Sequence, residues 1–519
     1  MQRPESKERV RFFPGTALLF LVLLLVAGCI AQDMPADKSD WDANLQAFRL
    51  ELSDLRADLG IPGIGYAVIS GGEVVESGAI GTLAADSSEP FSVDTPMNVQ
   101  SITKSIAGAV VMQLIEEGTL DLDVPIRSYL PDVELPSDVL LRHILTHTSE
   151  GIVGQEYVYS AGRYALLGPI IEQVTGQTFE RAIRERILEP SAMEWYESPS
   201  LSAAGGMVST TTDLARYVQA LDRGDLLQPS SMDRLAIPSK SIDGMDLPIS
   251  LGWFAQRIQG TPVVWSYGQD DTSALLLLVP DRGSAIVLLA RGGTMSDAFR
   301  LMMGDARKSP FAMTFYRLFI ASPAGAPLPR PDWEAADLAG ELQGQESKTE
   351  YSYEDELIGQ ALIHQWNDHQ TRSEALFQVA IDLYGVGEQA DPVIHFAGMR
   401  LAPGPVKKLT IDMGERLLAG HPNNRWLLYA QGGLLAESGA GAEAASLYQR
   451  MLDLPNQNQD FLHRLFDSWG WFGLARIYRD DDPEEARRAL RSIINCGAYV
   501  CPNRDQAESM LQELKGKGS

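Results

Sequence analysis

The sequence predicts an α/β (α+β) domain built on one antiparallel sheet with flanking helices, followed by an all-helical region. Strand-like runs occur at both ends of residues 42–322, and amphipathic helical segments lie between them. Residues 323–345 are rich in Pro, Ala and Gly, which is typical of a linker. Residues 346–519 then have a helical composition. We therefore expect two folded domains, 42–322 and 346–519, joined by this linker.

The elements of the first domain follow from local patterns. We expect helices at 42–59, 101–117, 138–146, 163–175, 178–188 and 212–221. We expect strands at 63–70, 73–80, 274–279 and 284–290. Gly71-Gly72 joins the first two strands in a hairpin-like turn, and Pro280–Gly283 joins the last two. Because strands come from both ends of the domain, they are expected to share one sheet.

The C-terminal region carries a repeat-like pattern. Residues typical of tetratricopeptide repeats stand at Gly432, Leu435, Ala444, Tyr448 and Pro455, and again at Leu474, Ala475, Tyr478 and Ala486. A helix pair at 355–367 and 373–384 fits the pattern more loosely. The alternative is an irregular helical bundle. Either structure predicts a packing or interaction module that binds a protein partner through these helices.

The N-terminus predicts a targeting segment. Basic residues up to Arg11 precede an apolar run at 17–26 that is too short for a comfortable membrane span. The string Leu-Val-Ala-Gly-Cys at 25–29 resembles a bacterial lipobox, which implies a signal peptide at 1–28, lipidation of Cys29 and a linker at 29–41. The protein would then be lipid-anchored in the cell envelope and face the periplasm or exterior. Ile30 is compatible with outer-membrane sorting, and an ordinary signal peptide or short membrane anchor is the alternative.

Charge, cysteines and histidines limit the function classes. The formal net charge of −26 argues against nucleic-acid binding. Cys496 and Cys501 are close in the chain, so a disulfide is expected in an oxidising compartment, with two free thiols as the alternative. His143 and His147 have the i, i+4 spacing of metal ligands, but no third ligand stands out. We therefore expect no metal and no organic cofactor.

Ser101 and Lys104 carry the strongest chemical signal. They stand three residues apart at the start of the apolar helix expected at 101–117, so both side chains share one helix face. The helix N-terminus favours negative charge on an alkoxide or oxyanion. Apolar neighbours would desolvate Lys104 and favour the neutral amine that accepts a proton. The alternative is an exposed serine beside a solvated lysine.

These residues belong to a wider resemblance over about residues 45–320. The stretches S-I-T-K (101–104), I-L-T-H-T-S (144–149), Y-S-A-G-R-Y (159–164), A-A-G-G-M-V-S-T (203–210) and W-S-Y-G (265–268) occur in that order. This region resembles the serine β-lactamase-related family, which includes class C β-lactamases, penicillin-binding D,D-peptidases and esterases. A G-x-S-x-G elbow is absent, which argues against an α/β-hydrolase.

The resemblance implies a role for each matching residue. Ser101 would be the acylated nucleophile, Lys104 would accept its proton, and Tyr159 would act as base and then as acid. The backbone N–H groups of Ser101 and Gln269 would form the oxyanion hole. His147 is expected to pack or cap its turn. The acids Glu150, Glu156 and Asp270 are expected on the solvated surface.

Two positions depart from the family pattern. Ala161 replaces the asparagine of a Y-x-N element. The third element, usually K-T-G or H-x-G, aligns as Ser266-Tyr267-Gly268, and a one-residue shift would place Tyr267 at the position of the usual cation or imidazole. The group that holds a substrate carboxylate is therefore missing.

These features lead to one expected function and two alternatives. We expect a lipid-anchored, extracytoplasmic serine hydrolase that forms an acyl-enzyme on Ser101 with a small-molecule or peptide ester or amide. The first alternative is a catalytically impaired binding module joined to a helical interaction domain. A dedicated β-lactamase is the second, and the missing carboxylate-binding group disfavours it.

Overall fold

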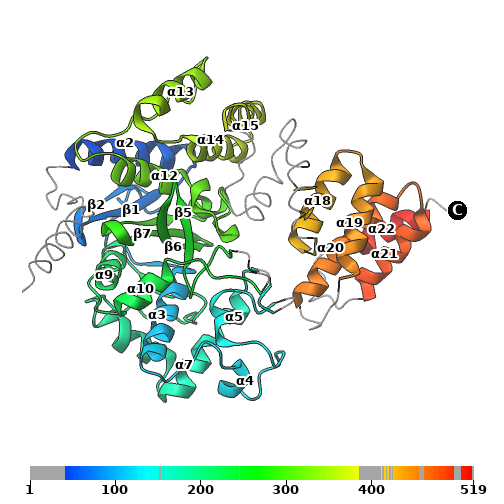
Figure 1. Cartoon of the computed structure of the whole chain (residues 1–519), viewed down its shortest axis with the longest axis horizontal. Coiled ribbons are helices and arrows are strands. Elements are labelled where there is room, and N and C mark those ends of the chain that lie inside the picture. Colours follow the sequence, from blue (N-terminus) through cyan, green and yellow to red (C-terminus); the bar gives the residue numbers. More distant parts are fainter. Residues whose placement is uncertain are drawn as a thin grey trace, which may run out of the picture.

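The computed structural model describes most of the chain from residue 41 to residue 516. The described residues are 41–150, 153–155, 157–242, 244, 246–384 and, within 411–516, all except 412–413, 416–417, 420–421, 424, 455–460 and 496–503. They form a mixed α/β unit and a helical unit (Figure 1). The expected signal peptide, the lipidation site Cys29 and the disulfide Cys496–Cys501 lie outside the described residues, as does Glu156. These expectations stay predictions.

Six strands form one antiparallel sheet. In spatial order they are β2 (Glu73–Gly81), β1 (Gly63–Ser70), β8 (Ser284–Arg291), β7 (Thr272–Val279), β6 (Thr261–Gln269) and β5 (Phe254–Ile258). Each neighbouring pair is antiparallel, and Ile64 of β1 lies opposite Ala290 of β8. The predicted sheet with strands from both ends of the domain is therefore confirmed.

The strands β5 and β6 were not predicted from the sequence. The sequence of β6, T-P-V-V-W-S-Y-G-Q, contains a proline and a glycine that are depleted from strands. Pairing with β7 on one side and β5 on the other overrides these local preferences. The W-S-Y-G motif therefore lies inside a strand of the sheet.

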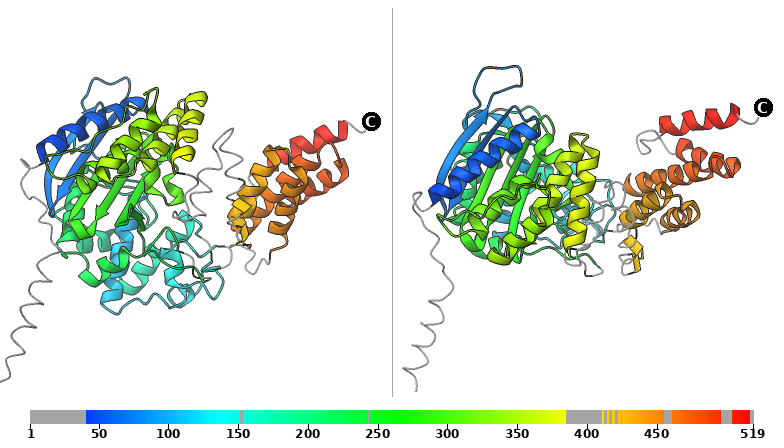
Figure 2. Two further views of the ribbon diagram at one scale, coloured as in Figure 1. Left: turned by 45° about the horizontal axis from the view of Figure 1, so that its top comes forward. Right: turned by 90° about the horizontal axis from the view of Figure 1, so that it is seen from above.

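Helices cover both faces of the sheet because the strand side chains alternate between two apolar cores. In β7, Leu275 and Leu277 enter one core, whereas Leu276 and Leu278 enter the other. The first core lies under α2 (Asp42–Asp58) and α12 (Pro310–Phe315). The second lies under α3 (Ile102–Glu116) and α9 (Thr211–Asp222). Figure 2 shows the sheet between these helical layers.

Short elements complete the α3 side of the sheet. They are β3 (Met97–Asn98), paired with β4 (Val208–Ser209), and the helices α4 (Ile126–Tyr129), α5 (Leu141–Leu145), α6 (Ala161–Tyr164), α7 (Leu167–Thr175), α8 (Phe179–Ile183) and α10 (Pro229–Leu235). The short helix α11 (Thr294–Asp297) lies on the other side, where Met295 enters the core of α2 and α12. The helix expected at 163–175 is thus divided into α6 and α7. The helix expected at 138–146 is reduced to α5, because Leu140 before it is extended.

Three further helices pack on the first domain. They are α13 (Leu338–Thr349), α14 (Glu354–Trp366) and α15 (Gln370–Tyr384), and their apolar side chains share the core of α2 and α12. Arg317, whose side chain is 0% exposed, joins these layers: its Nη2 lies 2.5 Å from Glu51 of α2 and its Nε 2.9 Å from Glu356 of α14. The structure therefore differs from the expected boundary, because residues 333–380 complete a core that α2 and α12 alone would leave exposed.

The C-terminal unit is all-helical, as predicted. It contains α18 (Arg425–Glu437), α19 (Gly441–Leu452), α20 (Phe461–Tyr478), α21 (Pro483–Asn495) and α22 (Arg504–Gly516). The ring of Tyr448 packs against two glycines, since a Cβ would lie 2.9 Å from it at Gly432 and 2.4 Å from it at Gly473. The assignment to tetratricopeptide repeats stays a prediction. No helix within the described part of the chain has the length and apolar character needed to cross a membrane.

Candidate active site

The structure brings Ser101 and Lys104 into direct contact at the start of α3. Ser101 is the N-cap residue, and its side chain is not used to cap the helix. Lys104 Nζ donates to Ser101 Oγ at 2.9 Å and to the carbonyl oxygen of Ala204 at 2.5 Å. Lys104 is only 4% exposed. The i, i+3 geometry predicted from the sequence is therefore present, and Ala204 brings the 203–210 motif to the same place.

The turn before Ser101 is strained and firmly anchored. Gln100 has φ 52°, a left-handed conformation that is uncommon for a residue other than glycine. Its backbone N–H donates to Asn98 Oδ1 at 2.8 Å, and its Nε2 donates to Asp271 Oδ1 at 2.7 Å and to Thr272 Oγ1 at 3.2 Å. Gln100 therefore ties the nucleophile turn to the β6–β7 hairpin. Sequence analysis missed this residue because its partners are about 170 residues away.

Gly268 explains how closely β6 approaches this turn. A Cβ on Gly268 would lie 2.5 Å from the carbonyl oxygen of Val99 and 3.2 Å from Cβ of Gln100. Only glycine fits such a contact without movement of the backbone. Because strand side chains alternate, Ser266 shares this face with Gly268, whereas Tyr267 lies in the opposite core with Trp265.

Tyr159 lies beside Lys104. The Nζ atom of Lys104 is 4.9 Å from the centre of the Tyr159 ring. This ring packs against His147, with centres 4.6 Å apart, and against Tyr267, with centres 5.9 Å apart. The Tyr159 hydroxyl is buried and has no partner of hydrogen-bonding geometry among the described residues. It is therefore available to a substrate or a water molecule.

The neighbour of Tyr159 on β6 is Tyr267 and not Ser266. Tyr267 is buried, and burial is the main reason why its pKa is raised well above its usual value, with Tyr159 adding to the effect. Its phenol is therefore neutral and offers a hydrogen bond without a positive charge.

His147 packs against Tyr159 and binds the backbone of the next residue. Its Nδ1 accepts the backbone N–H of Ser160 at 3.1 Å, so the proton of the neutral ring is on Nε2. Burial, and secondly Lys104, lower the pKa of His147 well below its usual value. His143 makes a similar bond, since its Nδ1 accepts the backbone N–H of Leu140 at 3.1 Å. The packing role predicted for His147 agrees with these contacts.

Glu150 differs from its prediction as a solvated acid. It is buried, and its Oε1 accepts the hydroxyl of Ser160 at 2.9 Å and Nε of Arg163 at 3.2 Å. The ion pair compensates the burial of the carboxylate and fixes the loop that carries Tyr159. Ala161 is the first residue of α6 and is exposed, so the missing asparagine amide leaves an open position at this edge of the site.

The two expected oxyanion donors lie at the ends of adjoining elements. Ser101 stands at the N-terminus of α3, where the helix dipole favours a negative charge. Gln269 is the last residue of β6, and its side-chain Oε1 is buried without a partner among the described residues. The contact between Gly268 and Val99 brings these two elements together.

Comparison with known proteins defines the class of this domain. Residues 48–302 match the family model described as Beta-lactamase, and the chain therefore carries a domain of the β-lactamase family. Over 359 residues the chain is 25% identical to penicillin-binding protein 4 of Amycolatopsis lactamdurans, which covers 52% of this chain and 91% of the relative. Over 284 residues it is 23% identical to the putative penicillin-binding protein PbpX of Bacillus subtilis. That alignment covers 44% of this chain and 72% of the relative.

A solved structure is also similar to about half of the chain. The octameric penicillin-binding protein homologue from Pyrococcus abyssi is 20% identical and has a TM-score of 0.43, with 51% of this chain and 79% of that chain covered.

Proposed function

We propose that the chain is a serine hydrolase in which Ser101 attacks the carbonyl carbon of an ester or amide and forms an acyl-enzyme. The observation that carries this proposal is the 2.9 Å contact between Lys104 Nζ and Ser101 Oγ at a buried helix N-terminus. A nucleophile within hydrogen-bonding distance of a base is the signature of covalent catalysis. Membership of a family of serine hydrolases supports the same chemistry.

The proposed reaction uses the contacts of Lys104 and Tyr159. As Ser101 Oγ bonds to the carbonyl carbon, its proton passes to Nζ of Lys104, which acts as the base. The Tyr159 hydroxyl gives a proton to the leaving alcohol or amine. It regains a proton from Lys104, which received it from Ser101. Water then attacks the acyl-enzyme by the reverse route. The N–H groups of Ser101 and Gln269 stabilise the oxyanion of each tetrahedral intermediate.

The charge of the site favours a neutral acyl substrate. The third element, Ser266-Tyr267-Gly268, contains no cation or imidazole, and the raised pKa of Tyr267 keeps its phenol uncharged. A carboxylate beside the scissile bond would find a phenol in place of an ion-pair partner. We therefore propose an ester or amide without that carboxylate as the substrate, in preference to a penicillin. This makes an esterase or amidase more favourable than a β-lactamase.

The location and the helical unit are further parts of the proposal. We propose removal of residues 1–28, lipidation of Cys29 and an extracytoplasmic location in the envelope, supported by the lipobox-like string at 25–29. The C-terminal helices α18–α22 are proposed to bind a protein partner, supported by their repeat-like pattern.

Covalent labelling tests the proposal. The purified chain is incubated separately with a fluorophosphonate and a penicillin, and its intact mass is measured. We expect one fluorophosphonate adduct that is lost in Ser101→Ala. The matched control is Ser105→Ala, because the Ser105 hydroxyl lies one turn further along α3 and donates to the carbonyl of Ile102 at 2.8 Å. An adduct retained in Ser101→Ala, or none in the unaltered chain, contradicts the proposal, and the second outcome favours the binding module.

A further inference from the structure

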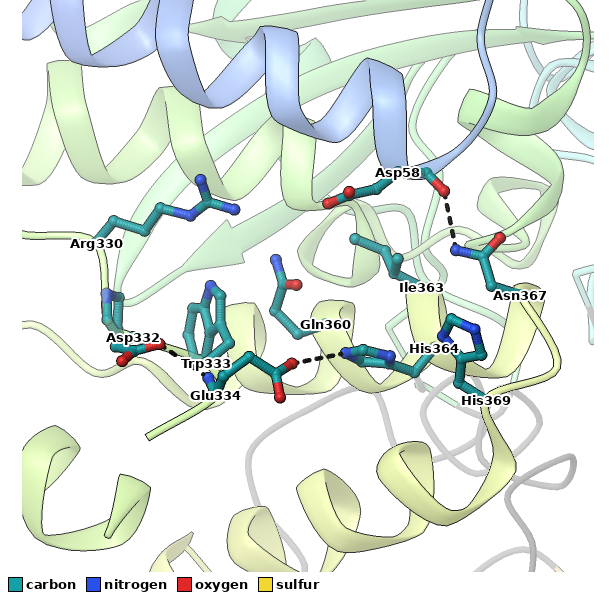
Figure 3. A pocket seen from close by; sticks show the side chains of 11 residues that line it. Asp58, Arg330, Asp332, Trp333, Glu334, Gln360, Ile363, His364, Asn367 and His369 are labelled. Carbon is teal, nitrogen blue, oxygen red and sulfur yellow. Dashed lines mark hydrogen bonds and ion pairs between the residues drawn. The ribbon is translucent and has the colours of Figure 1, made fainter. Parts of the chain in front are cut away.

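A polar cavity lies on the side of the sheet opposite to Ser101. It has a volume of about 430 Å³ and is formed by the end of α2, by residues 330–334 and by α14 (Figure 3). Trp333 and Ile363 of its lining belong to the core under α2 and α12, whereas the helix that starts at Ser101 belongs to the other core. The cavity is therefore separate from the proposed acylation site.

Gln360 is the unexplained polar group of this cavity. It is only 8% exposed, and its side-chain amide faces the open space of the cavity. Figure 3 shows the amide pointing away from α14 into the cavity, toward the space between Arg330 and Asp58. A buried amide normally finds partners for its donor and its acceptor, because an unpaired one is costly. The amide therefore offers a donor and an acceptor to a molecule that enters the cavity.

Two opposite charges flank the Gln360 amide. Arg330 donates from Nη1 to Asp54 Oδ2 at 2.6 Å, which leaves the other N–H groups of its guanidinium for a second acceptor. Asp58 lies close enough for Arg330 to affect its pKa, although burial is the largest effect and raises that pKa. The backbone carbonyl of Asp58 is held by Asn367 Nδ2 at 2.9 Å, so the end of α2 is fixed at the cavity.

The floor of the cavity is apolar. Trp333 is 7% exposed and Ile363 is 3% exposed, and both line the cavity below the charged groups. The acids Asp332 and Glu334 line the same cavity and disfavour an anion such as phosphate. A pure cation would leave Arg330 without an acceptor in the cavity. The lining thus combines a carboxylate partner, an ammonium partner and an apolar surface.

We propose that this cavity binds a free α-amino acid with an apolar side chain. Its carboxylate accepts from Arg330 and from Nε2 of Gln360. Its ammonium group donates to Asp58 and to Oε1 of Gln360, and its side chain covers Trp333 and Ile363. The volume is within the range of small-molecule pockets. This binding site is additional to the proposed hydrolase site and needs no chemistry at Ser101.

Calorimetric titration of the full chain tests the two-charge requirement. The probes are L-leucine and D-leucine, leucinamide, which lacks the carboxylate, and N-acetyl-leucine, which lacks the ammonium group. The Ser101→Ala chain is used throughout, so that no probe is hydrolysed. We expect one enantiomer of leucine to bind, and both modified probes to bind at least 10-fold more weakly. No heat with either leucine, or equal binding of leucinamide or of N-acetyl-leucine, overturns the proposal.

A matched pair of variants locates the site. Gln360→Met keeps the length of the side chain and removes both hydrogen-bonding groups, so leucine should bind at least 10-fold more weakly. Gln345→Met on α13 is the control, because Gln345 does not line the cavity. Thermal melting verifies that both variants fold. Unchanged affinity in Gln360→Met, or an equal loss in Gln345→Met, overturns the assignment to this cavity.

Discussion

The ring centre of His147 lies 4.6 Å from the ring centre of Tyr159, at an interplanar angle of 30°. His147 also holds the next residue, Ser160, through its Nδ1. It has φ 51°, so the backbone turns sharply where the ring enters the core. A neutral imidazole thus sets the position of the tyrosine proposed as the proton donor.

The His147→Asn variant should change how stability depends on pH. Burial lowers the pKa of His147 in the folded chain, so the unfolded chain binds its proton first as the pH falls. The contribution to stability is therefore complete above about pH 6.5 and is lost below it, by up to about 1.4 kcal/mol per pH unit, until the folded-state pKa is reached. Asparagine tolerates a left-handed φ and does not titrate. The free energy of unfolding should fall less between pH 7.5 and 5.5 in the variant.

Denaturant unfolding at the two pH values measures this difference. The exposed His369→Asn is the control and should leave the pH dependence of unfolding as it is in the unaltered chain. Parallel pH profiles for His147→Asn and the unaltered chain would contradict the buried neutral state of His147.

The Lys104→Met variant should slow acylation by about 100-fold or more, because general base catalysis by a side chain contributes about 10²–10⁴-fold. Methionine preserves the apolar stem and removes the amine that contacts Ser101 Oγ at 2.9 Å. The rate of fluorophosphonate adduct formation, followed by mass spectrometry, measures the effect. Lys240→Met is the control, because Lys240 is exposed and pairs with Asp246 on the surface. Equal rates for Lys104→Met and Lys240→Met would exclude Lys104 as the base.

The Tyr159→Phe variant should lower kcat/KM for a neutral ester by about 100-fold, which is the scale of one general acid–base group. The Tyr159 hydroxyl makes no hydrogen bond of good geometry among the described residues and interacts with the nearby Tyr267 phenol, so its removal should change the melting temperature little. Tyr157→Phe is the matched control, since that hydroxyl donates to the carbonyl of Met302 at 2.9 Å. An equal loss of activity in both variants would assign the effect to packing of the loop.

The Glu356→Gln variant should destabilise the first domain by about 1.5–3 kcal/mol, the usual contribution of a hydrogen bond to a charged group, because Arg317 loses one of its carboxylate partners. Arg317 is fully buried, and the loss of the Glu356 charge leaves it with Glu51 as its remaining carboxylate partner among the described residues. Denaturant unfolding followed by tryptophan fluorescence measures the change. Glu350→Gln is the control, because Glu350 is exposed. A loss below about 1 kcal/mol would show that the pair does not hold α14 in place.

Truncation tests which helices belong to the first domain. A chain that ends at residue 384 keeps α13–α15 over the core of α2 and α12, and it should melt cooperatively. A chain that ends at residue 322 exposes that core and removes Glu356, and it should aggregate or fail to melt cooperatively. Circular dichroism and size-exclusion chromatography compare the two chains. A folded, monomeric 322-residue chain would restore the boundary predicted from the sequence.

The sequence alone determined the local parts of the site. The contact between Ser101 and Lys104 needs only the i, i+3 geometry of one helix, so a short stretch of sequence was sufficient to predict it. Strand alternation and turn residues likewise predicted β1, β2, β7 and β8 closely. These features depend on neighbours within a few residues, and their physical cause can be read along the chain.

Only the tertiary structure decided the parts that depend on distant pairing. Pairing with β7 on one side and with β5 on the other places W-S-Y-G inside β6. Side-chain alternation along β6 then puts Tyr267, rather than Ser266, beside Tyr159. Gln100 fixes the turn before Ser101 because its side chain donates to Asp271. The helix α14 is attached to the first domain by the ion pair between Glu356 and Arg317. Such contacts join residues far apart in sequence, and their energy arises from burial and charge pairing that no local pattern encodes.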